Sequence, residues 1–153
     1  MPKIDLDALP QANRTGYPAE FADAVAGRWY RRLAPATGLT EFGMSHVVLK
    51  PGAWSAHRHW HVEEDEVVIM LAGAAVLIDD NGRTDMRPGD VAVFPKNDGN
   101  GHHLVNESDS DCTFIAIGRP AEGECHYPDI DMHIGPDGRY RRKDGTAFEQ
   151  ASG

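Results

Sequence analysis

Three histidines at alternate positions constrain this chain more than any other feature of its sequence. They are His57, His59 and His61, within the stretch PGAWSAHRHWHVEEDEVVIMLAG that spans residues 51–73. Side chains two residues apart in an extended chain point to the same face, so this alternation predicts a strand with all three imidazoles on one side. Glu66 has the opposite parity, and a turn or bulge must precede it if its carboxylate is to join them.

Imidazoles that converge with a carboxylate suit a divalent transition metal. No cysteine lies nearby, which argues against a structural zinc site built from thiolates. This set of ligand types serves Mn, Fe, Ni, Zn and Cu, so the sequence leaves the metal open.

Around the histidine stretch, short apolar segments alternate with turn signals. The segment Asp80-Asn81-Gly82 predicts a hairpin, because Asn-Gly tolerates the positive φ that tight hairpin turns need. Many short strands and few helices favour an antiparallel barrel or a two-sheet sandwich. The expected strands cover residues 42–49, 74–78, 84–87, 91–94, 102–106 and 112–117.

Outside this strand series, the chain has two less regular ends. Residues 1–17 are interpreted as an arm, and Pro18 to Ala26 as a short helix with proline in its first turn. The arginines of the next segment, RWYRRL, are interpreted as a solvated or salt-bridged surface. In the tail, Asp137-Gly138 predicts a hairpin or a pair of extended pieces. We expect the tail to pack on the barrel or on a neighbouring subunit without forming a second core.

Composition limits the class of protein. A chain of 153 residues is expected to form one domain, with arm and helix at about 1–38, barrel at about 39–118 and extension at about 119–153. The net charge of -9 argues against nucleic acid or an anionic membrane as partner. No apolar run suits a signal peptide or a membrane span, so we expect a cytoplasmic protein. Cys112 and Cys125 are expected to be free thiols.

Two spaced patterns in this sequence resemble the motif pair of the cupin superfamily. The first cupin motif, G-x5-H-x-H-x3-4-E-x6-G, matches Gly52, His59, His61, Glu66 and Gly73, with six residues in place of five after Gly52. The second motif, G-x5-P-x-G-x2-H-x3-N, has a longer central loop in this chain and lacks the glycine at Asn97. Its matching residues are Gly89, Pro95, His102 and Asn106.

This resemblance implies an all-β fold, a double-stranded β-helix or jelly-roll barrel. It also implies that His59, His61, Glu66 and His102 bind one divalent metal ion. The alternative register, through His57 and His59, leaves no glutamate at the required spacing from a glycine. More narrowly, the chain resembles small bacterial single-domain cupins of largely unassigned function, and that likeness implies a homodimer.

The resemblance favours a metal-dependent enzyme that acts on a sugar-like or carboxylate metabolite, as an isomerase, lyase, decarboxylase or dioxygenase. His57 and Glu64 are the candidates for proton transfer. The non-catalytic alternatives are that His57 occupies a half-exposed strand position, and that the carboxylate of Glu64 is solvated or orients His59 or His61. A non-catalytic module that binds or senses a small molecule is the alternative function. Sequence alone names neither the substrate nor the reaction.

Overall fold

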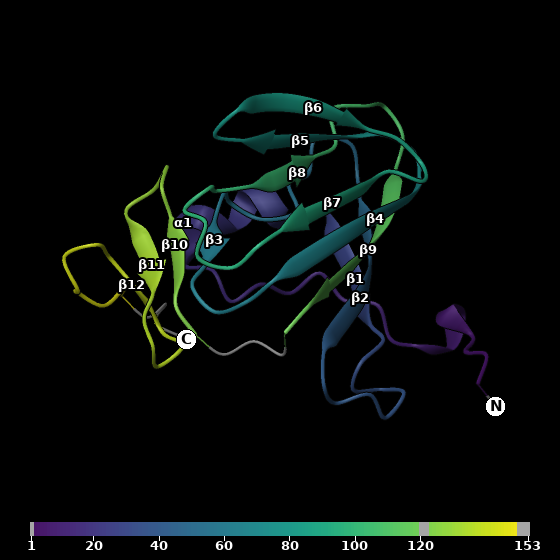
Figure 1. Cartoon of the computed structure of the whole chain (residues 1–153), viewed down its shortest axis with the longest axis horizontal. Coiled ribbons are helices and arrows are strands. Elements are labelled where there is room, and N and C mark those ends of the chain that lie inside the picture. Colours follow the sequence, from purple (N-terminus) through teal and green to yellow (C-terminus); the bar gives the residue numbers. More distant parts are fainter. Residues whose placement is uncertain (1, 120–122, 150–153) are drawn as a thin grey trace.

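The architecture in the computed structural model, which describes residues 2–119 and 123–149, is almost entirely β (Figure 1). The short helical pieces are the 3-10 helix Leu6–Ala8, α1 (Ala19–Ala22) and the 3-10 helix Asp23–Val25. The strands are β1 (Arg28–Arg32), β2 (Gly43–Leu49), β3 (Trp60–His61), β4 (Glu66–Ala72), β5 (Ala75–Asp79), β6 (Gly82–Met86), β7 (Val91–Phe94), β8 (His103–Val105), β9 (Cys112–Gly118), β10 (Cys125–Tyr127), β11 (Met132–Ile134) and β12 (Tyr140–Arg141).

Two antiparallel sheets form the jelly-roll barrel. One has the order β1-β2-β9-β4-β7 and the other the order β6-β5-β8. Their inner faces meet in an apolar core because alternate side chains along each strand point inward. Met70 on β4 is only 1% exposed, and burial of such a side chain contributes about 1.5–3 kcal/mol. The buried core residues are Val47, Leu49, Ala53, Val68, Met70, Ala75, Met86, Ala92, Leu104, Cys112 and Phe114.

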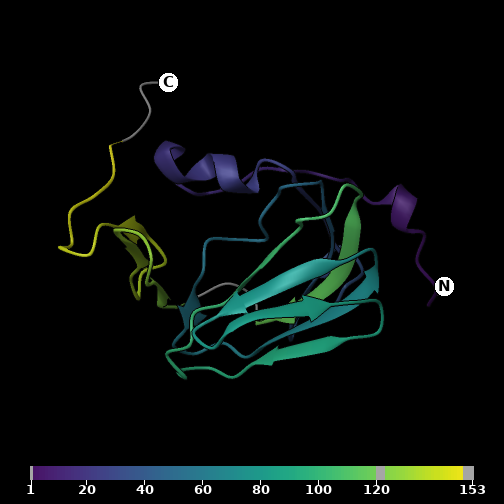
Figure 2. The same cartoon turned by 90° about the horizontal axis from the view of Figure 1, so that it is seen from above.

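The two ends of the chain pack together beside the barrel. The tail strands continue a third sheet, in the order β12-β11-β10-β3, so β10 pairs directly with the strand that carries His61. Cys125, Tyr127 and Met132 form a small second cluster, against which Tyr17 and Phe21 of the N-terminal segment pack. The tail thus packs on the barrel as expected, but the expectation that it forms no second core is wrong, because together with the N-terminal segment it builds this cluster. Figure 2 shows the helical segment alongside the barrel strands and the tail at one end.

Most predicted strands are found within a residue or two of their expected bounds. The Asn-Gly hairpin joins β5 to β6, with Asp79 paired to Gly82, and the tail hairpin pairs Ile134 with Tyr140. Both cysteines are free and buried. The segment interpreted only as a basic surface is in fact strand β1, which pairs along its length with β2. Among the residues described, no helix is long and apolar enough to cross a membrane.

Candidate metal centre and substrate cavity

Three histidine side chains converge on the carboxylate of Glu66. Its Oε2 lies 2.6 Å from Nε2 of His102 and 3.7 Å from Nε2 of His59. Its Oε1 lies 3.2 Å from Nε2 of His61. The four candidate metal ligands thus come together, and each imidazole presents the same ring nitrogen, Nε2.

Backbone pairing brings these side chains together from three parts of the chain. His59 and His102 form an isolated antiparallel bridge, with N–H···O distances of 3.1 and 2.9 Å in the two directions. His61 ends β3, and the chain turns through residues 62–65 before Glu66 begins β4. The turn expected between His61 and Glu66 is therefore present, and it brings Glu66 to the side of the imidazoles despite its parity.

The remaining ring nitrogens of His59 and His61 face fixed partners. Nδ1 of His59 donates a hydrogen bond to the carbonyl oxygen of His57 at 2.8 Å, and Nδ1 of His61 lies 3.4 Å from Oε2 of Glu64. Such contacts hold a metal-binding imidazole in one tautomer and leave the lone pair of Nε2 available. Three Nε2 atoms and a carboxylate therefore fit a divalent transition metal, with positions left for water or substrate.

Burial and hydrogen bonding act against each other in this cluster. Burial alone would raise the pKa of Glu66, but the neighbouring imidazoles of His102, His59 and His61 hold it well below its usual value. Burial opposes the charged form of His61, but hydrogen bonds with Cys125 and Glu66 outweigh it and raise the pKa of His61 to about 11. For His102, burial dominates and lowers the pKa. Glu66 is thus a carboxylate surrounded by imidazole rings.

Glu64 is the proton-transfer candidate that the structure places at the site. Its side chain is 16% exposed and lines the same cavity as the cluster, so it is not a solvated surface residue. Burial raises the pKa of its carboxyl group. Gly118 lies close by, and a Cβ at that position would collide with Oε1 of Glu64. The absence of a side chain at 118 therefore makes room for this carboxyl group.

His57 does not join the other histidines. Residues 55–58 form a series of bends, so the parity argument for an extended chain fails between His57 and His59. Nε2 of His57 donates to the carbonyl oxygen of Phe21 at 2.8 Å, and its ring packs edge-on against Tyr17 and Trp54. These contacts give His57 a packing role between the helical segment and the barrel.

No pattern in the sequence indicates that Cys125 lies beside the cluster. Cys125 pairs with His61 across β10 and β3, and its thiol comes within reach of ligand nitrogens of His59 and His61. The pairing spans more than sixty residues of chain, so only the folded tail reveals it. Tyr127, on the same strand, places its ring 5.8 Å from that of His59. The tail therefore contributes to the surroundings of the histidine cluster.

The cluster opens into a cavity of about 750 Å³. Pockets of roughly 300–1,000 Å³ are the usual size for small-molecule sites. Aromatic and polar side chains contribute much of its wall, including Tyr17, Tyr30, Tyr127, Tyr140, Ser45 and Ser55. This cavity has room for a small polar ligand beside the histidines.

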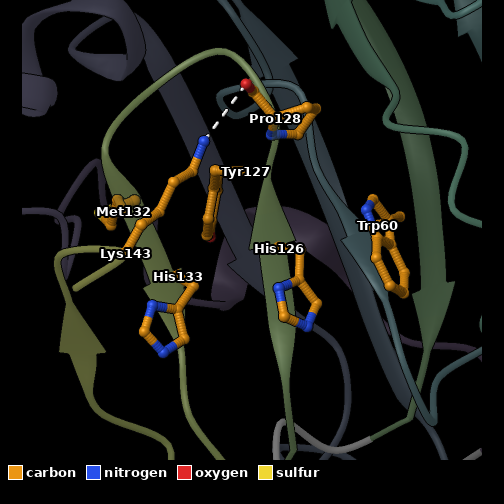
Figure 3. Close-up of a pocket in the computed structure, with 7 residues that line it drawn as sticks. All are labelled: Trp60, His126, Tyr127, Pro128, Met132, His133 and Lys143. Carbon is orange, nitrogen blue, oxygen red and sulfur yellow. Dashed lines mark hydrogen bonds between the residues drawn. The ribbon is translucent and has the colours of Figure 1, made fainter. Parts of the chain in front are cut away.

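A second, smaller pocket of about 270 Å³ lies on the opposite side of β3 (Figure 3). Trp60 lies between His59 and His61 in sequence and therefore points away from the cluster. Its ring stacks on that of His126 at 4.6 Å, and His133 continues the row at 6.1 Å from His126. Nζ of Lys143 approaches the carbonyl oxygen of Pro128 at 3.4 Å across the pocket.

Comparison with known proteins agrees with this fold and these motifs. Residues 45–118 match the family model described as "Cupin domain". A crystal structure of a sugar phosphate isomerase of the cupin superfamily, from Silicibacter pomeroyi, is 41% identical, with a TM-score of 0.90 over 97% of both chains. At that identity and coverage, this chain belongs to the cupin superfamily.

Other solved structures share the barrel at lower identity. A Cupin 2 conserved barrel domain protein from Salinispora arenicola is 26% identical, with a TM-score of 0.56 over 79% of this chain and 88% of its own. A polyketide cyclase from Streptomyces resistomycificus is 19% identical, with a TM-score of 0.63 over 77% and 78%, and is similar in fold alone. A search of curated protein sequences found no match.

Proposed function

We propose that this protein is a metal-dependent isomerase that acts on a phosphorylated sugar. The observation that carries the proposal is the convergence of three imidazole Nε2 atoms on Glu66 inside a cavity of about 750 Å³, with Glu64 beside them. The substrate class is supported by the Silicibacter pomeroyi protein, described as a sugar phosphate isomerase and similar over nearly the whole chain.

In this proposal, His59, His61, Glu66 and His102 hold the metal. When bound, a divalent ion supplies Lewis-acid polarisation of a sugar carbonyl and stabilises the negative charge that develops on its oxygen. Isomerisation of an aldose to a ketose moves one proton from the carbon beside the carbonyl to the carbonyl carbon. A second proton moves from the hydroxyl oxygen of that neighbouring carbon to the former carbonyl oxygen, so that atoms and charge balance. A positioned carboxylate can carry that proton between neighbouring carbons.

Glu64 is the residue proposed for this proton transfer. It lines the cavity and touches His61, whereas the imidazole of His57 faces Phe21 and Tyr17. We expect Glu64→Gln to reduce kcat by about 100-fold or more, since general acid–base catalysis contributes about 10²–10⁴-fold. We expect His57→Ala to keep kcat within a few-fold of the unchanged protein while lowering its melting temperature. Equal turnover in both variants and the unchanged protein would remove both residues from the chemistry.

The isomerase proposal is tested with metal-loaded protein and a panel of phosphorylated aldoses and ketoses in D2O, followed by NMR. We expect one pair to interconvert, with deuterium incorporated at the carbon next to the carbonyl. The matched control is His59→Ala/His102→Ala, which should leave the same sugars unchanged. Return of every sugar unaltered after hours with the holo protein would favour the alternative, a module that binds a small molecule without turning it over.

We further propose that the protein is a homodimer, formed through the outer face of β4 and β7. Leu71, Val91 and Val93 on that face are 46%, 57% and 64% exposed. Two chains of net charge -9 repel each other, and an uncharged face is where they can approach at least cost. Sedimentation velocity should report a dimer, and Val91→Lys/Val93→Lys a monomer. A monomer for the unchanged chain at micromolar concentration would contradict this.

A further inference from the structure

The cavity that holds the histidine cluster carries a charge opposite to that of the whole chain. Arginines outnumber carboxylates along its wall, with Arg14, Arg28, Arg32 and Arg119 against Glu64 and Glu66. The whole chain, by contrast, has 24 acidic residues and a net charge of -9. A concentration of guanidinium groups in the cavity of an acidic protein raises the local concentration of anions there.

Strand β1 places two of these arginines on the cavity side. Arg28, Tyr30 and Arg32 alternate along the strand and all line the cavity, because side chains two apart share a face. Arg31, between them, points the other way, where its Nε donates to the carbonyl oxygen of Leu9 and its Nη2 lies 3.6 Å from Asp7. Arg31 therefore ties the N-terminal arm to one face of the strand, whereas Arg28 and Arg32 lie on the face that borders the cavity.

The cavity arginines differ from most others in lacking a carboxylate partner. Arg58, Arg141 and Arg142 each pair with an acidic side chain, as do Arg31 and Arg83. Within residues 2–119 and 123–149, no ion pair involves Arg14, Arg28 or Arg32. Nε of Arg28 is also buried without a hydrogen-bond partner among the described residues. A buried unpaired donor of this kind costs free energy unless something accepts its proton.

The same arginines are held in place by neutral contacts. Nη1 of Arg28 donates to the carbonyl oxygen of Ser55 at 2.8 Å. The guanidinium carbons of Arg28 and Arg32 lie 5.7 and 5.6 Å from the centre of the Tyr30 ring, within the range of cation–π attraction. The hydroxyl of Tyr30 donates to the carbonyl oxygen of Arg14 at 3.0 Å, which ties the N-terminal arm to the strand. Tyr30 is therefore a positioning residue for the side chains of Arg28 and Arg32 and for the backbone of Arg14.

We propose that Arg28, assisted by Arg32 and Arg14, forms a binding site for a phosphate monoester dianion in the same cavity as the metal cluster. Guanidinium groups bind phosphate oxygens through paired, charge-assisted hydrogen bonds. Several guanidinium groups together complement the double negative charge of a phosphate monoester better than they complement the single charge of a carboxylate. That this phosphate belongs to the substrate rests on the isomerase proposal. The anion site itself rests on the arginines alone.

The test measures binding of inorganic phosphate, by isothermal titration calorimetry, to protein freed of metal by dialysis against a chelator. Removal of metal excludes phosphate binding to the ion. We expect binding by the unchanged protein, and affinity weaker by about tenfold or more in Arg28→Gln, because hydrogen bonds to charged groups are among the strongest in proteins. Arg28→Lys should recover part of the affinity. Arg31→Gln is the matched control, from the same strand but the opposite face, and should change affinity by less than about twofold.

Two results would overturn the anion site: equal phosphate binding by Arg28→Gln and the unchanged protein, or an equal loss in Arg31→Gln. A loss of folded structure in Arg28→Gln is detected by circular dichroism, and Arg32→Gln then serves as the second variant, with weaker binding expected. The isomerase proposal fails separately. If phosphate binding depends on Arg28 but no sugar phosphate is turned over, the anion site stands and the isomerase proposal is refuted. If Arg28→Gln turns over a sugar phosphate with an unchanged KM, the anion site is refuted and the isomerase proposal stands.

Discussion

Two groups of histidines lie on opposite sides of the sheet that contains β3, β10 and β11, and they differ in convergence and in exposure. On the inner face, His59 and His61 join His102 around the buried carboxylate of Glu66. On the outer face, His126 and His133 lie parallel in a row with Trp60 (Figure 3). Nε2 of His126 lies 3.4 Å from Glu124, but these side chains are 36% and 39% exposed.

This difference shows that convergence, and not the number of imidazoles, defines a metal site. The inner rings are inclined to one another, His59 to His61 by 85°, so their nitrogens can point to one place. The outer rings of His126 and His133 are stacked, 9° from parallel, with their centres 6.1 Å apart. In the described part of the chain, the groups of three or more side chains able to hold a metal all lie on the inner side.

Metal content should separate the two groups most strongly. We expect protein purified without a metal-affinity column to carry a divalent transition metal, and the His59→Ala/His102→Ala variant to have an occupancy close to zero, since it loses two of four ligands. The matched outer variant, His126→Ala/His133→Ala, should retain the occupancy of the unchanged protein. Elemental analysis measures both. Equal loss in the two variants, or retention in both, would contradict the distinction between the faces.

Removal of the metal should lower the stability of the protein through the inner group alone. A ligand that binds only the native state stabilises it by about 2.7 kcal/mol when its free concentration is about 100 times its Kd. We therefore expect a chelator to lower the melting temperature of the unchanged protein and of the outer double variant by the same amount. The inner double variant should not respond. Differential scanning calorimetry with and without chelator checks this, and a response of the inner variant would contradict it.

The outer stack should contribute only modestly to stability. The rings of Trp60 and His126 stack at 4.6 Å, and aromatic pairs contribute about 0.5–1.5 kcal/mol beyond the area they bury. We expect His126→Ala to lower the free energy of unfolding by about 1 kcal/mol without changing the metal content. Urea denaturation measures the first quantity and elemental analysis the second. A loss of metal in this variant would mean that the outer face supports the inner one.

Sequence patterns predicted the barrel, but they predicted β1 poorly for a physical reason. Strands are recognised by an apolar face that alternates with a polar face. In β1 the inner face carries Arg28, Tyr30 and Arg32 because it borders a cavity, so neither face is purely apolar. A strand that lines a binding cavity therefore resembles a charged surface segment in sequence.

The candidate site was predictable where spacing within one motif determines geometry. His59, His61, Glu66 and His102 come together as the motif implied, although their role as metal ligands stays a prediction. The predicted position of His57, on the same face as His59 and His61, was wrong because bends at residues 55–58 break the strand parity. Cys125 and Tyr127 could not have been placed beside the histidines, because their position depends on a long-range pairing between β10 and β3.

The pairing of β10 with β3 has a consequence for how such proteins diverge. The match to the cupin family ends at residue 118, yet Tyr127, Ile134 and Tyr140 beyond it line the cavity. Relatives that share the barrel but differ in the tail therefore share the histidine cluster and differ in one wall of the cavity around it. Replacement of this terminal segment can therefore change which small molecules fit the cavity while it leaves the histidines unchanged.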